Sequence, residues 1–209
     1  MFIVFEGIEG SGKSTQARRL SEWLTARGVR NVLTREPGGT ALGERIRDLL
    51  LHSEDVPARA ELLLMMAARA AFVQQVVRPA LERGDVVISD RYELSSYAYQ
   101  GYGRGLPLDE VRSVNELATC GLRPDLTILL DVEPQEGAAR RRRAGRTEDR
   151  IERAGEAFHA EVGRAYRLLS STEPGISVVS GAGTEEEVAQ RVMSVLRARF
   201  PETFPADQG

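Results

Sequence analysis

Cysteine and long apolar runs are scarce in this chain of 209 residues, whose single cysteine is Cys120. One cysteine allows no internal disulfide and fits a reducing compartment, so we expect a cytoplasmic protein. No apolar run approaches the length of a membrane span, and no basic leader with an apolar core precedes the first predicted strand. These absences predict a soluble protein that does not act in a membrane.

The chain also lacks an excess of basic residues. Its formal net charge is −3 and its pI is about 5.6, whereas proteins that bind nucleic acid usually carry a basic surface. We therefore expect small-molecule partners and no nucleic acid. The hydrophobic fraction of 42% can form one sizeable core, so we predict a single domain over residues 1–200. Residues 201–209 contain two prolines and no periodicity, which predicts a flexible tail.

Lysine is the scarcest charged residue, because Lys13 is the only lysine among 28 basic residues. It lies in a segment that matches the G-x-x-x-x-G-K-[ST] phosphate-binding loop, Gly7-Ile8-Glu9-Gly10-Ser11-Gly12-Lys13-Ser14. A compact ammonium on a thin stem can lie beside a phosphate chain as a point charge, whereas a planar guanidinium favours flat bidentate pairing. A lone lysine at this position indicates that the loop binds phosphate.

The segments on both sides of the motif have the order that a phosphate-binding loop requires. Residues 2–5 form a short apolar run typical of a buried strand, and a helix is predicted from Thr15. Backbone N–H groups of such a loop point at phosphate oxygens, and the positive end of the helix dipole adds to the attraction. A glycine-rich turn without a ligand is the less favoured alternative. The dinucleotide fingerprint G-x-G-x-x-G is excluded, because the glycines here are spaced G-x-x-G-x-G.

Short apolar runs alternate with longer helical patterns, which indicates an α/β fold with a parallel sheet and helices on both faces. The predicted strands cover residues 2–6, 32–35, 86–90, 126–131 and 177–180. The longest helical pattern runs from about residue 58 to residue 83, ends before Gly84 and is apolar all round in its middle. Such a helix predicts that a partner subunit covers one of its sides.

Polar residues follow the predicted strands at the edge of a parallel sheet where ligands bind. The second strand leads into Arg35 and Glu36, and the third ends in Asp90 followed by Arg91. A phosphate loop also needs a magnesium ion, held here by the serine of the motif and supported by an acid that ends a neighbouring apolar strand. Asp90 and Asp131 both qualify. We favour Asp90, because a paired arginine suits a phosphate site.

The alternative role of Asp131 is to cap the helix predicted to begin near Pro134.

Six arginines lie within eleven residues of the segment that follows this helix start: Arg140, Arg141, Arg142, Arg143, Arg146 and Arg150. A solvated charge run is the usual role of such a segment. The phosphate loop changes this interpretation, because an arginine from a closing segment can stabilise the charge that phosphoryl transfer spreads over oxygens. Gly145 would let the segment move, so we predict a short arginine-rich lid at about residues 140–150.

These motifs together give the chain a specific likeness. Up to about residue 199 it resembles bacterial thymidylate kinase, a member of the nucleoside-monophosphate kinases with a P-loop NTPase-type fold. The resemblance rests on residues 5–16, 34–40, 67–69, 90–92, 98–101 and 149–152. It implies a five-stranded parallel sheet and a homodimer formed through the helix at 58–83. It also implies transfer of the γ-phosphate of ATP to dTMP, with magnesium, to give dTDP and ADP.

The resemblance implies four groups of site residues. The ATP phosphates are held by Gly7, Ile8, Glu9, Gly10, Ser11, Gly12, Lys13, Ser14 and Thr15. Magnesium is ligated, directly or through water, by Ser14, Asp90 and Glu36. The substrate dTMP is bound by Glu9, Arg35, Glu36, Pro37, Met65, Arg69, Arg91, Tyr92, Ser96 and Gln100. The catalytic residues are Lys13, Arg35, Asp90, Arg91, Arg143, Arg146 and Arg150.

Within the dTMP group, the resemblance implies that Arg35 and Arg91 grip the phosphate. Glu9 receives the 3′-hydroxyl and Tyr92 packs against the deoxyribose, which leaves no room for a 2′-hydroxyl. The thymine base is implied to hydrogen-bond to Arg69, Ser96 and Gln100. Residues 181–184 resemble the loop that flanks adenine.

The family has two layouts for one catalytic residue, and the chain departs from many relatives at one other position. Family members carry the transition-state arginine either in the phosphate loop or in the lid, and this loop has none. The resemblance therefore assigns that role to the lid, with Arg143, Arg146 and Arg150 as candidates. In addition, Met65 stands where many relatives have the phenylalanine that stacks on thymine. A thioether can also cover an aromatic face, so this difference is compatible with the same substrate.

Two other functions stay open at this stage. A kinase for another deoxynucleotide or deoxynucleoside would share the motifs. A nucleotide-binding switch from another class would hold a triphosphate without an acceptor, but a guanine-reading Asn-Lys-x-Asp segment does not exist in a chain whose only lysine is Lys13.

Overall fold

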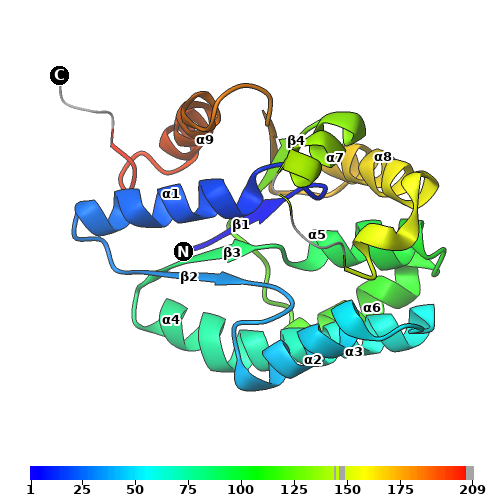
Figure 1. Ribbon diagram of the computed structural model, residues 1–209. Coiled ribbons are helices and arrows are strands. Elements are labelled where there is room, and N and C mark those ends of the chain that lie inside the picture. Colours follow the sequence, from blue (N-terminus) through cyan, green and yellow to red (C-terminus); the bar gives the residue numbers. More distant parts are fainter. Residues whose placement is uncertain (144, 146–148, 206–209) are drawn as a thin grey trace.

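A computed structural model describes residues 1–143, 145 and 149–205 (Figure 1). Its five strands are all parallel, in the order β2-β3-β1-β4-β5. The strands are β1 Phe2–Glu6, β2 Asn31–Arg35, β3 Val86–Asp90, β4 Leu126–Asp131 and β5 Ile176–Ser180. The helices are α1 Lys13–Ala26, α2 Ala41–His52, α3 Ala58–Phe72, η1 Val73–Val77, α4 Arg78–Glu82, α5 Glu93–Ser96, η2 Tyr97–Gly103, α6 Leu108–Thr119, α7 Pro134–Arg143, η3 Glu152–Ala154, α8 Glu156–Thr172 and α9 Glu185–Arg199.

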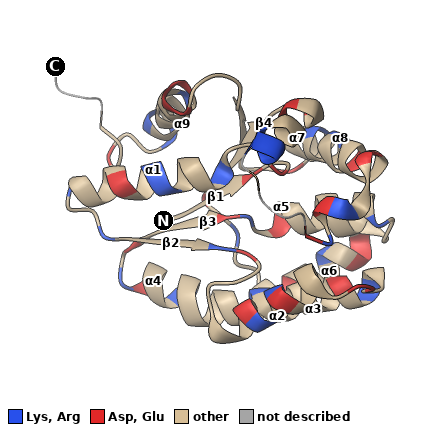
Figure 2. Cartoon of the chain, in the orientation of Figure 1, with Lys and Arg blue, Asp and Glu red and all other residues tan. Residues whose placement is uncertain are grey.

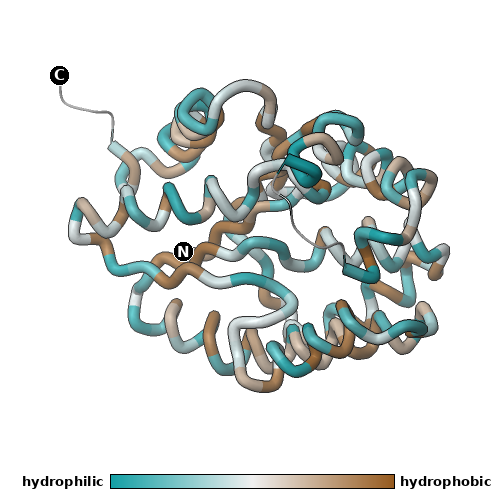
Figure 3. Tube along the Cα trace, viewed as in Figure 1, coloured by the Kyte–Doolittle hydropathy of each residue, from teal (hydrophilic) through white to brown (hydrophobic). Residues whose placement is uncertain are grey.

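The central strand β1 has apolar side chains on both of its faces, as a strand in the middle of a covered parallel sheet requires. Ile3 and Phe5 pack in a core with α1 and α9, whereas Phe2 and Val4 pack in a second core with α3, η1 and α4. Figure 1 shows these helices above and below the sheet, and Figure 3 shows the hydrophobic strands between them. The predicted α/β architecture with helices on both faces is confirmed.

A third apolar cluster is built mainly by helices, together with Leu129 of β4 and Ile8 of the phosphate loop. It joins α2, α3, η2, α6 and α8, and it includes Met65, Tyr99 and Tyr166. The phosphate loop at the end of β1 faces this helical layer, because β1 leads directly from the sheet to Gly7. The space between the loop and the helical layer is where the candidate site lies.

The long apolar helix has an irregular middle. It runs without a break from Ala58 to Glu82, but η1 is a π-helical segment between α3 and α4. Its 25 residues are long and apolar enough, by length and composition alone, to cross a membrane. This corrects the expectation that no apolar run approaches such a length. Of its most apolar window, 50% is buried inside the molecule, and a core helix of a soluble protein passes the same test.

The tail predicted to be flexible from residue 201 is packed over the part that the structure describes. Phe204 has no exposed surface, and its ring stacks on Trp23 of α1 with 5.6 Å between the ring centroids. One aromatic residue in a stretch without periodicity is enough to dock the segment, because a buried phenylalanine removes a large apolar surface from water. Phe204 is thus docked in this structure, and the flexibility of the tail stays a prediction.

Candidate functional site

A cavity of about 1360 Å³ lies at the carboxyl ends of β1, β2 and β3. It is bounded by the phosphate loop, the segment after β2, one face of α3 and η2, and α7. Figure 2 shows that the strands carry few charged residues, whereas arginines gather on α7 beside the loop. The cavity is thus a charged site at the edge of an apolar sheet, the usual ligand position in a parallel α/β fold.

The phosphate loop has the backbone conformation that its glycines allow. Gly10 and Gly12 have φ angles of 79° and 95°, which are unfavourable for residues with a side chain. α1 begins immediately afterwards at Lys13, so the N-terminus of a 14-residue helix points at the cavity. The predicted loop residues from Glu9 to Thr15 line the cavity, whereas Gly7 and Ile8 support it from behind.

Lys13 is held inside this loop. Its ammonium donates to the Ile8 carbonyl at 2.8 Å, and the residue is only 5% exposed. Burial and the nearby Arg91 charge lower the pKa of Lys13, while the carboxylate of Glu9 opposes that shift. A cation in such surroundings is stabilised by any anion that enters the cavity.

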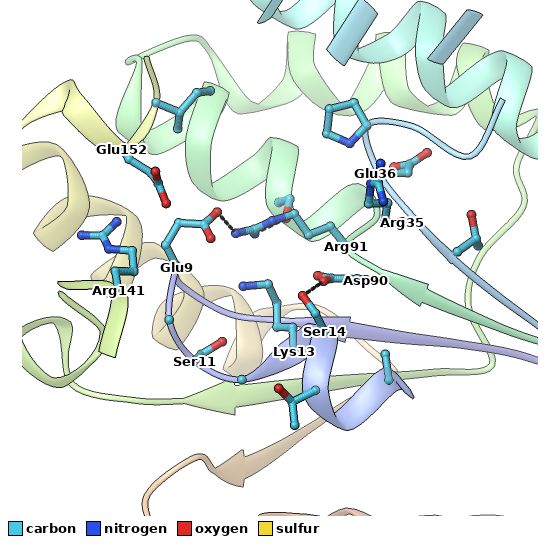
Figure 4. Close-up of a pocket in the computed structure, with 18 of the residues that line it drawn as sticks. Glu9, Ser11, Lys13, Ser14, Arg35, Glu36, Asp90, Arg91, Arg141 and Glu152 are labelled. Carbon is cyan, nitrogen blue, oxygen red and sulfur yellow. Dashed lines mark hydrogen bonds and ion pairs between the residues drawn. The ribbon is translucent and has the colours of Figure 1, made fainter. Parts of the chain in front are cut away.

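Glu9 and Arg91 form an ion pair across the mouth of the loop (Figure 4). Burial raises the pKa of Glu9, but the charges of Arg91 and Lys13 outweigh burial and lower that pKa to about 2. Glu9 is therefore a permanent carboxylate that can only accept hydrogen bonds. Such a group can receive a hydroxyl of a ligand.

Arg91 has a φ of 78°, an uncommon conformation for a residue with a side chain. The buried carboxylate of Glu6 holds the next turn in place by accepting from the Tyr92 N–H at 2.8 Å and the Ser95 N–H at 3.1 Å. The Arg91 guanidinium also donates to the Tyr99 hydroxyl at 3.2 Å. Strained residues often occur at functional sites because the surroundings fix them.

Ser14 and Asp90 are in direct contact, because the Ser14 hydroxyl donates to Asp90 Oδ2 (Figure 4). Asp90 Oδ1 is buried and has no hydrogen-bond partner among the described residues. The other candidate acid, Asp131, lies 3.5 Å from Arg167 on α8. A hydroxyl beside an incompletely satisfied carboxylate fits Mg²⁺, so of the two acids Asp90 has the suitable surroundings.

No group of three or more His, Cys, Asp or Glu in the described part of the chain could hold a metal without help. At phosphate sites, Mg²⁺ is usually bound by one or two protein groups together with substrate phosphates.

Glu36 and Arg35 have different environments although they are neighbours. Burial raises the pKa of Glu36 to about 7 even though Arg69 opposes that shift, and Glu36 Oε1 has no partner among the described residues. Arg35 is half-exposed and donates to Glu44 at 3.0 and 3.2 Å. Arg47 of α2 also lines the cavity. It was not predicted from the sequence, because it lies in no motif. Arg35 and Arg47 make this wall cationic.

Met65, Gln100 and Pro37 line the cavity, as predicted for residues that contact the substrate. Arg69 and Ser96 do not line it. Arg69 is fully buried, and its guanidinium donates within the protein to Glu36, Ser96, Asn115 and the Tyr92 carbonyl. These hydrogen bonds hold α3 to α5, to α6 and to the segments that follow β2 and β3. A thymine contact of Arg69 or Ser96 stays a prediction.

The structure corrects the prediction for Tyr92. Its side chain has no exposed surface, its ring packs on Phe2 with centroids 5.0 Å apart, and its hydroxyl donates to the Leu122 carbonyl. It therefore faces the core under the sheet. Tyr99 lines the cavity beside Arg91 instead. Tyr99 was not predicted from the sequence. The backbone turn at Arg91 decides which of the two tyrosine rings faces the cavity, and the sequence pattern does not reveal that turn.

Of the three predicted lid arginines, the two that the structure describes do not line the cavity. Arg143 is exposed at the end of α7 and does not line the cavity, and Arg146 lies outside the described residues. Arg150 donates to Glu61 at 2.7 Å and to the Leu50 carbonyl at 2.8 Å, pointing away from the cavity. Its role in this structure is to attach the end of the lid to α2 and α3.

Arg140, Arg141 and Arg142 of α7 line the cavity, and Arg141 points toward Glu9 and Glu152 (Figure 4). Its Nε and Nη1 atoms are buried and have no partner among the described residues. Arg143 lies two positions later on the same helix, which turns its side chain about 200° away. The sequence alone could not select Arg141, because four consecutive arginines sample every side of a helix and only packing decides which one faces the loop.

Comparison with known proteins agrees with this geometry. Residues 5–192 match the family model described as thymidylate kinase. The thymidylate kinase of Synechococcus sp. (strain JA-3-3Ab) is 48% identical over 206 residues, covering 98% of this chain and 99% of that protein. The protein of the same description from Desulfovibrio desulfuricans is 47% identical, covering 95% of each.

A solved structure gives the same result for the fold. The crystal structure of thymidylate kinase from Ehrlichia chaffeensis has a TM-score of 0.79 and 33% sequence identity, and the match covers 94% of this chain and 98% of that one. The phosphate loop, the Glu9–Arg91 pair and these full-length similarities lead to one assignment. The chain belongs to the thymidylate kinase family.

Proposed function

We propose that this chain transfers the γ-phosphate of ATP to dTMP, giving dTDP and ADP. The observation that carries the proposal is a single cavity in which the phosphate loop with Lys13 lies next to the Glu9–Arg91 pair. A phosphoryl donor and a phosphoryl acceptor bound in this cavity would meet beside these groups. In phosphoryl transfer, positioning and charge stabilisation supply most of the catalysis.

The donor side is the phosphate loop and the start of α1. The loop N–H groups and Lys13 bind the ATP phosphates as point donors and a point charge. Gly181, Gly183 and Thr184 line the same cavity and would flank the adenine. The acceptor oxygen of dTMP attacks the γ-phosphorus, the bond to the β-phosphate oxygen breaks, and ADP leaves.

The acceptor side is cationic where a phosphate would enter and aromatic where a sugar would lie. Arg35 and Arg91 are proposed to hold the dTMP phosphate, and Glu9 its 3′-hydroxyl. Tyr99, whose hydroxyl accepts from Arg91 at 3.2 Å, is proposed to pack against the deoxyribose in place of Tyr92. This arrangement favours a deoxynucleotide over a ribonucleotide because the buried ring leaves little room for a 2′-hydroxyl.

Arg141 is proposed to stabilise the transferring phosphoryl group. Its guanidinium is inside the cavity and carries N–H groups without partners among the described residues, as an arginine that waits for a negative charge would. Magnesium is proposed to bind to Ser14 and Asp90, with Glu36 acting through water. Bound there, the ion neutralises charge on the β- and γ-phosphates.

A homodimer is proposed through the face that α2, α3 and α6 share. Exposed leucines on these helices support it: Leu42, Leu49, Leu63 and Leu117. Apolar patches of this kind usually mark protein interfaces. Sedimentation equilibrium measures the association directly.

We also propose a cytoplasmic enzyme that binds neither nucleic acid nor membranes, as the net charge of −3 suggests.

The proposal is tested by measuring ADP formation from ATP with and without dTMP, and with magnesium or a chelator. We expect turnover that requires both dTMP and magnesium. A nucleotide-binding switch would bind ATP tightly and give the same low turnover with and without dTMP, which would contradict the proposal. Binding of a fluorescent ATP analogue to Ser14→Ala and Asp90→Asn variants, with and without magnesium, tests the metal site separately from turnover.

A further inference from the structure

Glu61 of α3 is a buried carboxylate behind the cavity wall that the reaction itself does not use. Its side chain has no exposed surface and accepts hydrogen bonds from three other residues, two of them in or next to η2 and one at position 150. Arg150 donates to Oε2 at 2.7 Å, Arg104 donates to both oxygens at 3.2 and 3.3 Å, and the Gln100 amide nitrogen donates to Oε1 at 2.8 Å. Of these partners, only Gln100 lines the cavity.

The charge of Glu61 decides which way the Gln100 amide points. Burial raises the pKa of Glu61, but the hydrogen bonds from Gln100 and Arg150 and the charge of Arg104 outweigh it, so the net shift is downward. An ionised carboxylate has acceptors only. The NH₂ end of the Gln100 amide must therefore face Glu61, and the carbonyl Oε1 must face the other way.

The Gln100 carbonyl is left without a protein partner. Gln100 is 2% exposed, and its Oε1 is buried with no hydrogen bond to any described residue. A buried acceptor of this kind requires a donor, and in a binding cavity the donor comes from the ligand. Had the amide been reversed, the cavity would offer two N–H donors instead of one carbonyl.

We propose that Glu61 is a positioning residue that sets base specificity through Gln100, by fixing a carbonyl acceptor in the cavity. The proposal rests on the proposed function and deepens it. Thymine and uracil carry an N–H at ring position 3 that can donate to this carbonyl. Cytosine carries an acceptor nitrogen at the same position. In dCMP this nitrogen and the Gln100 carbonyl would be two acceptors facing each other. Glu61 therefore discriminates dTMP from dCMP but not dTMP from dUMP.

The test compares acceptors in the wild-type protein and in Glu61→Gln. A neutral amide at position 61 can either donate or accept, so it no longer fixes Gln100. We expect the ratio of kcat/KM for dTMP to that for dCMP to fall about tenfold or more, which corresponds to the loss of a specific hydrogen bond. The ratio for dTMP to dUMP should stay within about twofold, because both bases carry the same donor.

Two variants serve as controls. Glu110→Gln removes an exposed carboxylate of α6 that pairs with Arg59, which lies on the same helix as Glu61, α3. This variant should change neither ratio. Gln100→Met removes the amide and should lower the dTMP to dCMP ratio by itself. Adding Glu61→Gln to Gln100→Met should then lower the ratio no further, because Glu61 acts through Gln100.

The outcomes separate this inference from the proposed function. If the wild-type protein does not phosphorylate dTMP, the proposed function fails. If it does, and folded Glu61→Gln loses activity on all acceptors equally, Glu61 is only structural and the inference is wrong. Should Glu61→Gln not fold, NMR of the wild-type protein decides. The Gln100 NH₂ protons, assigned by their loss in Gln100→Met, should exchange slowly with solvent. Exchange as fast as that of exposed amides would overturn the inference.

Discussion

Charged side chains in the cavity take their chemistry from their nearest neighbours. Glu9 is ionised because Arg91 and Lys13 flank it, and Lys13 is a buried cation supported by the Ile8 carbonyl at 2.8 Å. A phosphate chain that enters this site meets a thin ammonium between the loop backbone and the Glu9–Arg91 pair. The shape of that cation therefore matters as much as its charge.

Lys13→Arg should keep the fold and the charge but lose most of the activity. A guanidinium is too wide for the buried position, where Lys13 is 5% exposed, and displacement of the phosphates by about 1 Å can cost on the order of a hundredfold in rate. Steady-state kinetics with ATP and dTMP measures the loss. Arg45→Lys, at an exposed position of α2 outside the cavity, is the matched exchange and should have no effect.

Arg141→Ala should lower kcat about a thousandfold, the usual cost of removing an arginine that stabilises phosphoryl transfer. Arg143→Ala and Arg150→Ala are the comparisons, because the sequence pattern favoured those positions. Arg143→Ala should retain nearly full turnover, and Arg150→Ala should lose mainly thermal stability, since Arg150 pairs with buried Glu61. A larger kcat loss in Arg143→Ala than in Arg141→Ala would contradict the assignment.

Met65 and Met66 allow a neighbouring pair to separate substrate contact from packing. Both are buried at 9% and 5% exposure, but only Met65 lines the cavity. Met65→Ala should raise KM for dTMP about three- to tenfold through lost cover of the base, whereas Met66→Ala should leave KM unchanged. Both variants should have a lower Tm, because each leaves a cavity in the core. An unchanged KM in folded Met65→Ala would mean that Met65 is core only.

At the scale of elements, the sequence predicted the sheet better than the loops between its strands. The bounds of β1, β3 and β4 agree with the prediction, and β2 and β5 each begin one residue earlier. Buried strands have a clear apolar signal, whereas β2 and β5 are edge strands with mixed burial and a weaker one. The π-helical segment η1 and the docking of Phe204 depend on tertiary packing and leave no periodic pattern in the sequence.

The same division holds for the candidate site. The phosphate loop and the polar strand ends follow from motif and position, so Lys13, Asp90 and Arg91 could be predicted. Which of two tyrosines lines the cavity, and which arginine of α7 lies beside Glu9, depends on side-chain direction. Tyr99 and Arg141 were therefore found only in the structure.

The contact between α7 and the phosphate loop is close enough to test as a unit. Gly137 of α7 lies against the loop, and a Cβ there would lie 2.6 Å from the Glu9 carbonyl. Gly137→Ala should push α7 and the loop apart and lower kcat/KM for ATP on the order of a hundredfold without unfolding the protein. Gly163→Ala on α8, where a Cβ would lie 3.5 Å from Pro134, should be tolerated. Equal kinetics of the two variants would show that α7 does not need this contact.

At the scale of the whole molecule, one cavity collects residues from distant parts of the chain. The loop after β1, the segment after β2, η2 and α7 all contribute, and Glu61 joins α3 to η2 and to the end of the lid. The two apolar cores on the sheet hold the strand ends in register, so these side chains meet at fixed positions. Specificity is therefore a property of the assembled fold.

A coupled assay of ADP formation with dTMP, dUMP, dCMP, dGMP and thymidine as acceptors tests the central claim most directly. We expect the highest kcat/KM with dTMP, lower values with dUMP, and little or no turnover with dCMP, dGMP or thymidine. Thymidine should fail because it carries no phosphate for Arg35 and Arg91 to hold. A higher kcat/KM with any other acceptor, or no turnover with dTMP, would contradict the account.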